Sequence, residues 1–270
     1  MTTETLTPSL ADEAAKREVV RAERNAAFEK CFGGNYMERF TDPIHFLSVG
    51  FLNYRIHKFY ENNYAFMSKN LFSEYVYRRR AKYNRDLLVR YFDLMAKKLG
   101  GVSAILTKYH GQVDHVLKVN NQTDDEIGYL REYKELVPVI HAQARQYLDL
   151  LLSADQLFMK LAAGVLSGLI DSNEKTEIER KVILSFRAIG NTVRNEAITL
   201  RKEATRVRNE MQSEGIHDEE LDSAIDTQTR AAAEGAVVEK NNAKIDGVAF
   251  TDTPAMNEFA QEQAAEATAA

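Results

Sequence analysis

The sequence predicts an all-α protein with an aromatic-rich helical body, a long coiled-coil-like helix and a flexible acidic C-terminal tail. Only four prolines interrupt its 270 residues, and proline is the residue that most strongly breaks helices. Apolar residues recur every three or four positions over long stretches, as they do on the buried face of a helix. The sequence contains no series of short alternating segments that would indicate a sheet of many strands.

Residues 9–170 are expected to form the helical body, because all twelve tyrosines precede Leu148. The first helix should span about residues 11–32 and end at Gly33-Gly34. Asp42-Pro43 then combines a capping carboxylate with a proline suited to the first helical position. This pair predicts a second helix from residue 43 to about residue 60.

A third helix is predicted over residues 68–99, where one apolar stripe recurs with helical spacing. Gly100-Gly101 should end it, and a shorter helix should follow over residues 103–119. The capping box that begins at Thr123 predicts another helix, which Pro138 should kink or break. The helical pattern then resumes towards Leu152.

The apolar segment from Leu148 to Ile170 is long enough to cross a membrane, but it contains Asp149, Asp155 and Lys160. An ionisable group at the centre of a bilayer costs about 2.5–3.5 kcal/mol even on a lenient insertion scale. A helix buried in the core explains the same residues at lower cost. We therefore expect no membrane span.

Residues 171–214 are predicted to form the longest helix, with apolar positions in a heptad-like pattern. A helix of about forty residues is about 60 Å long, which exceeds a compact domain of this size. We therefore expect part of it to seek a partner, although packing within one chain would satisfy the same pattern. The candidate seam between subunits consists of Val193, Ala197, Leu200, Ala204, Val207 and Met211.

The C-terminal region is strongly acidic, with fourteen Asp or Glu and three Lys or Arg between residues 209 and 270. A weak helix is expected over residues 215–238. From residue 239 onward the composition is rich in Ala, Glu, Asn and Thr, and apolar residues are scattered. Such a segment buries too little surface to offset its conformational entropy, so we expect a disordered tail.

A basic cluster on the predicted third helix is a candidate polyanion-binding site. Arg78, Lys82 and Arg85 would lie within about 60° of one another on a helical wheel, and Lys69 extends the same surface. Cations on a helix can bind phosphates without reading base sequence. A solvated helix face explains them equally, and the acidic C-terminal region could occupy the cluster. Arg80 instead points into the apolar stripe, where an ion pair is expected.

The sequence shows no catalytic constellation. Cys31 is the one cysteine, and a helix C-terminus, where we expect it, disfavours a reactive thiolate. His110 and His115 have a spacing that is unfavourable for ligands on one helix face, and no HExxH motif is present. We therefore expect no catalytic residue, no cofactor and no metal. The first twenty residues lack the apolar core of a signal peptide, which favours a cytoplasmic location.

These patterns together predict a non-enzymatic interaction or assembly protein, which associates with itself or with a protein partner through its long helix. Two alternatives remain open. A nucleic-acid-binding accessory protein would use the basic face between residues 69 and 90. A helical enzyme would use a site that the sequence does not reveal.

Overall fold

The computed structural model describes residues 10–33, 40, 42–120 and 129–248, and it is an all-α protein with one small sheet. The expected fold class is confirmed. In chain order the described elements are α1 (Leu10–Phe32), β1 (His45–Phe51), α3 (Tyr54–Arg78), α4 (Arg85–Val119), β2 (Tyr133–Val139), α5 (Ala142–Leu166), α6 (Ser172–Ser213) and α7 (Glu219–Val248).

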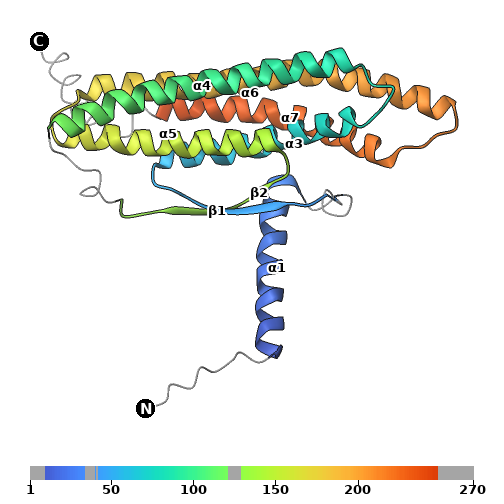
Figure 1. Ribbon diagram of the computed structural model, residues 1–270, viewed down its shortest axis with the longest axis horizontal. Coiled ribbons are helices and arrows are strands. Elements are labelled where there is room, and N and C mark those ends of the chain that lie inside the picture. The colour runs from blue at the N-terminus through green and yellow to red at the C-terminus, as the bar shows by residue number, and fades with distance from the viewer. Residues whose placement is uncertain (1–9, 34–39, 41, 121–128, 249–270) are drawn as a thin grey trace, which may run out of the picture.

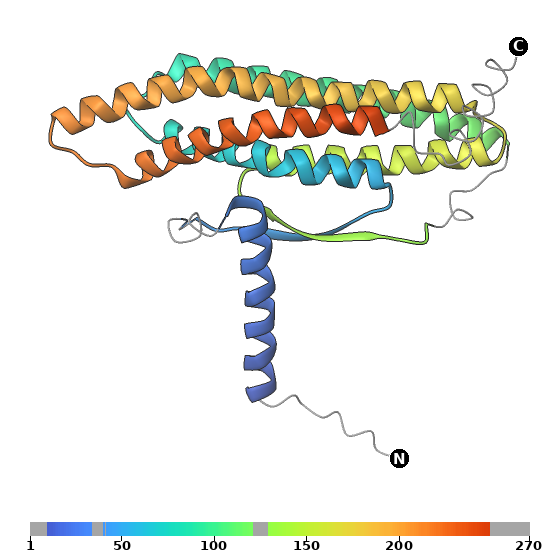
Figure 2. The same cartoon turned by 180° about the vertical axis from the view of Figure 1, so that it is seen from behind.

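Helices α3 to α7 lie side by side along the long axis and form an elongated bundle (Figure 1). The sheet lies along one side of this bundle, and α1 extends away from it on the other side of the sheet, as both views show (Figure 2). Helix α3 is central because it packs against α7, α5 and α6. Large aromatic side chains such as Phe59, Tyr64 and Tyr77 on α3 are fully buried. The aromatic-rich body is therefore the core of the bundle.

The apolar segment from Leu148 to Ile170 lies mostly in α5, and side chains such as Leu151, Leu157 and Phe158 are completely buried in the bundle. This agrees with the core helix that the sequence indicated. Among the described residues, none of the helices combines the length and the apolar composition that crossing a membrane requires.

The prediction of a helix over residues 43–60 is wrong over its first half. Residues 45–51 form β1, which pairs antiparallel with β2, and Phe46 lies opposite Pro138. The predicted helix around Pro138 is therefore also a strand. The local signal of Asp42-Pro43 is overridden because each strand satisfies its backbone hydrogen bonds with a segment far away in the sequence.

The predicted helix over residues 68–99 belongs to two helices, because the chain turns between α3 and α4 at residues 79–84. Asn84 ends this turn, and its side chain accepts hydrogen bonds from the backbone N–H groups of Asp86 and Leu87. Gly100 and Gly101 do not end a helix but lie inside α4, where both are exposed. One continuous helix therefore replaces the two expected over residues 85–119.

These two glycines offer a direct test of helix α4. A Cβ atom added at Gly100 or Gly101 would have nothing within 4 Å beyond the helix itself. Because alanine is better than glycine in a helix interior by about 0.5–1 kcal/mol, we expect each Gly→Ala substitution to raise the free energy of unfolding by that amount. Urea denaturation followed by circular dichroism checks this, and a loss of stability would contradict the continuous helix.

The long helix is confirmed as α6. The side chain of Asp171 caps its first turn by accepting from the N–H of Asn173, and Gly215 follows its end with a φ of 77°. Helix α7 is longer than expected, because residues 239–248 are helical rather than part of a disordered tail. The capping box at Thr123 and residues 249–270 lie outside the described residues.

Candidate functional site

The seam expected to join subunits is buried inside this one chain. Five of its members are at most 5% exposed, and Met211 packs against the same core: the buried members are Val193, Ala197, Leu200, Ala204 and Val207. Helix α6 contacts α4, α7, α3 and α5. The pattern therefore marks an intramolecular interface, and in this conformation it is not accessible to a second subunit.

The four cations of the expected polyanion-binding face do not share one surface. Lys69 is buried within α3, and Arg78 ends that helix with its guanidinium 5.6 Å from the ring centre of Phe92. Lys82 lies in the turn after α3, and Arg85 begins α4. The helical wheel placed them together because it assumed one continuous helix through residues 79–84.

Acidic side chains from the end of α6 and the start of α7 neutralise this turn. Lys82 pairs with Glu214, and Arg79 lies 3.2 Å from Glu220. Arg80 Nε lies 2.6 Å from Asp218 Oδ2 in the expected ion pair. Of the four cations predicted to bind phosphates, Lys82 is therefore paired with a carboxylate of the same chain, as are its neighbours Arg79 and Arg80.

Helix α1 differs from every other helix because it stands away from the bundle (Figures 1 and 2). Residues 15–26 are exposed on all sides of the helix. An isolated helix of about twelve residues is only marginally stable in water. The helical conformation of residues 15–26 would therefore be stabilised if another surface covered it.

The last turns of α1 anchor it to the sheet. Phe28 and Phe32 are buried, and Lys30 Nζ lies 2.8 Å from Glu135 Oε2 on β2. The Phe28 ring lies 5.6 Å from the ring of Phe40, which in turn contacts Phe72 of α3 at 4.9 Å. These contacts fix the base of the projecting helix against the body.

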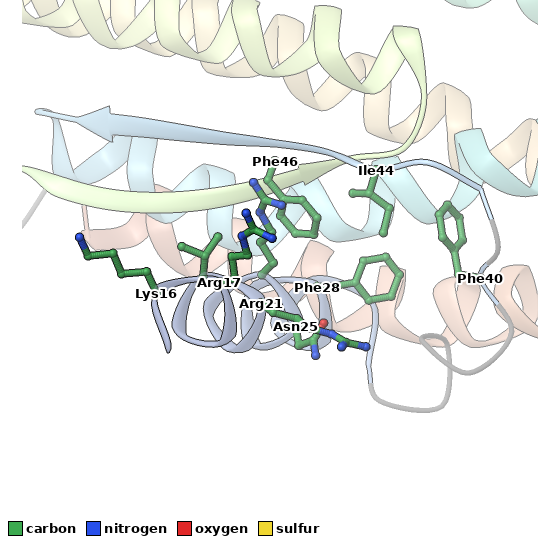
Figure 3. Close-up of a pocket in the computed structure, with 10 residues that line it drawn as sticks. Lys16, Arg17, Arg21, Asn25, Phe28, Phe40, Ile44 and Phe46 are labelled. Carbon is green, nitrogen blue, oxygen red and sulfur yellow. The ribbon is translucent and has the colours of Figure 1, made fainter. Parts of the chain in front are cut away.

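A cleft of about 710 Å³ opens between α1 and the segment that leads into β1. Figure 3 shows Ile44 and Phe46 on the segment that enters β1 and Phe28 opposite them on α1, while Arg17 extends from α1 towards Phe46. The described lining residues are Lys16, Arg17, Val20, Arg21, Arg24, Asn25, Phe28, Phe40, Ile44 and Phe46. Four of them are cations, and none of them carries a carboxylate.

The cleft combines an apolar wall with a cationic rim. The guanidinium of Arg24 lies 5.6 Å from the ring centre of Phe46, so a cation–π contact helps to orient it. Such an arrangement can bind a ligand that is anionic at one edge and apolar at another. Cys31, also on α1, is not among the residues that line the cleft, and burial raises the pKa of its thiol to about 11.

This site was not predicted from the sequence, although its cationic half is visible there. Arg17, Arg21 and Arg24 have spacings of four and three, which places them on one face of the first helix. The apolar half was hidden because Ile44 and Phe46 were assigned to a helix. Only the sheet brings this segment beside α1.

No family model matches the sequence, and no curated protein matches it. Among solved structures, the chain is similar to AcaB from uropathogenic E. coli, known from a crystal structure of the selenomethionine-containing protein. The two share 16% sequence identity with a TM-score of 0.51, and the similarity covers 68% of this chain and 98% of AcaB. This likeness concerns the fold alone.

Proposed function

We propose that this chain is a non-enzymatic interaction protein that binds an acidic, partly apolar segment of another protein in the cleft between α1 and β1. The observation that carries the proposal is the projecting helix, exposed on all sides over residues 15–26, beside a cleft with four cations on its rim. The bundle then serves as a support for this site. The partner would dock on the cleft and not on the long helix α6.

Charge complementarity selects the partner. Carboxylates of an acidic segment can pair with Arg17, Arg21 and Arg24, and opposite charges speed association and discriminate against basic partners. Apolar side chains of the same segment can cover Val20 and the phenyl ring of Phe46. A polyanion without apolar groups would leave this second half of the cleft unused.

Fluorescence anisotropy on the full chain tests this proposal. The probe is a labelled sixteen-residue peptide that alternates Glu with Leu and Phe, and a second peptide carries Ser in place of Leu and Phe. We expect the double variant Arg21→Glu, Arg24→Glu to bind the first peptide at least tenfold more weakly, which corresponds to about 1.4 kcal/mol. The Ser-containing peptide should bind wild type about tenfold more weakly than the first peptide does.

The matched control is Lys97→Glu, Lys98→Glu on α4, which makes the same change in net charge far from the cleft and should leave affinity unchanged. Equal binding of the two peptides, or equal losses in both double variants, would overturn the proposal. Tighter binding of single-stranded DNA than of the acidic peptide would favour the nucleic-acid alternative. Light scattering tests whether the partner is a second copy of this chain. In that case wild type would be a dimer, and the Arg21→Glu, Arg24→Glu variant would be a monomer.

A further inference from the structure

A trio of metal-ligating side chains lies where α3 meets β2. His57 and Glu61 are four residues apart on α3, which places them on one face of the helix. Glu135 reaches the same place from β2, and its Oε1 lies 3.0 Å from His57 Nε2. One ligand atom from each of the three residues lies within 4.8 Å of the others. We propose that His57, Glu61 and Glu135 bind a divalent transition-metal ion of the zinc class.

The donor set suits such an ion. Zinc is bound by imidazole nitrogen and carboxylate oxygen at about 2.0–2.2 Å, and its sites often combine three protein ligands with a water molecule. The three ligand atoms, which lie within 4.8 Å of one another, must adjust their separations to reach a single ion. Glu61 allows this movement because its side chain is 30% exposed, whereas His57 is held in place by its burial.

The imidazole of His57 is prepared for a ligand role. Its ring stacks on Tyr133 with the ring centres 4.6 Å apart, which fixes the plane of the ring. Its other nitrogen, Nδ1, is buried and has no hydrogen-bond partner among the described residues. The stacking on Tyr133, and not a second hydrogen bond, therefore orients the ring.

Two lysines now supply the charge that the ion would supply. Lys30 pairs with Glu135, and Lys58 lies 3.0 Å from Glu61. The side chains of Lys30 and Lys58 are 59% and 43% exposed, so both can move into water. One divalent cation replaces two ammonium charges, and the site stays electrically balanced. Binding would also release Lys30, which anchors α1, and would thus couple the metal to the projecting helix.

Calorimetric titration of the metal-free full chain with ZnCl2 tests this inference. We expect one site per chain, and Glu61→Gln should weaken Zn²⁺ binding at least tenfold because it removes one ligand. Lys58→Gln should strengthen binding several-fold, since it removes a competing cation. If the cluster is only a set of structural ion pairs, we expect no Zn²⁺ binding in wild type or in Lys58→Gln, because loss of a lysine creates no affinity for metal.

His115→Asn and Glu177→Gln are the controls and should leave affinity unchanged, since His115 is exposed and Glu177 lies on α6 with its side chain 44% exposed. Circular dichroism verifies that each variant is folded. No stoichiometric binding at 0.1 mM Zn²⁺, or binding that is unaffected by Glu61→Gln, would overturn the inference. The peptide-binding proposal is tested independently, because that assay is performed without metal.

Discussion

Replacing Asp155 by alanine is expected to lower the free energy of unfolding by about 2–4 kcal/mol. Asp155 lies on α5 and is 3% exposed. Its two carboxylate oxygens accept hydrogen bonds from the backbone N–H groups of Leu52 at 2.9 Å and Asn53 at 2.8 Å. One side chain therefore fixes the corner where β1 turns into α3.

The size of this effect follows from what the substitution leaves behind. Burial raises the pKa of Asp155, while the two N–H groups act in the opposite direction by stabilising its charged form. Alanine would keep the desolvated N–H groups of Leu52 and Asn53 but remove their acceptor, and an unsatisfied buried donor costs about 1–3 kcal/mol. The substitution would destabilise the end of β1, the strand that carries Phe46 of the cleft.

Thermal unfolding measures this expectation, and a loss of about 5–10 °C in Tm is anticipated for a chain of this size. The matched control is Asp149→Ala on the same helix. Asp149 is half-exposed and pairs with Arg145 one turn away, so its loss should cost less than about 1 kcal/mol. Equal losses in both variants would show that the corner does not depend on Asp155.

Replacing Glu74 by glutamine is expected to stabilise the protein at neutral pH. Glu74 lies on α3 and is completely buried. Neither of its oxygens has a hydrogen bond of good geometry within the described part of the chain. Burial raises the pKa of Glu74 well above its ordinary value, and the neighbouring Tyr91 hydroxyl opposes this only in part.

The sign of the pH dependence follows from that raised pKa. Below the pKa of the unfolded state, about 4.3, Glu74 is protonated in both states and burial of a charge costs nothing. As the pH rises towards the folded-state pKa, the unfolded chain ionises first, and wild type loses stability. Glutamine does not ionise, so the advantage of Glu74→Gln should grow with pH from about 4.3 upward.

Chemical denaturation at pH 4, 5, 6 and 7 measures this difference. Glu177→Gln is a control of opposite sign, because hydrogen bonding to Arg180 lowers the pKa of the exposed Glu177 to about 2. Its carboxylate stabilises the folded state above the unfolded-state pKa and loses this effect as the pH falls. A Glu74→Gln variant whose advantage does not change with pH would contradict a neutral carboxyl in the core.

Helical periodicity and capping residues predicted those parts of the fold that depend on local sequence. Helix α1 ends at Phe32, before Gly33 with its φ of 85°, as predicted, and α6 begins after Asp171 as predicted. The break at Asn84 was also encoded locally, since asparagine is a good N-cap. It was missed because the apolar stripe continues through the turn.

The sheet and the sites built on it were not predictable in this way. Residues 45–51 become a strand only because residues 133–139 pair with them, and no local pattern identifies that partner. The ligand trio has the same limitation: the spacing of His57 and Glu61 is visible in the sequence, but Glu135 joins them only through the register of β2. The seam on α6 was predicted correctly as a buried face. Its heptad pattern could not show whether a second subunit or helices of the same chain bury it.

The pairing of β1 with β2 also determines when the protein can complete its fold. The paired strands are more than 80 positions apart in the chain, and closing so long a loop is slow compared with helix formation. During synthesis at about 5–20 residues per second, β1 leaves the ribosome roughly 4–19 seconds before its partner. For that time the strand His45–Phe51 has, among the described elements, no strand partner on either edge. An unpaired strand is a hazard for aggregation during this time. The ligand trio and the side of the cleft at Phe46 can take their final form only once β2 has been made, while α5, α6 and α7 are still to be synthesised.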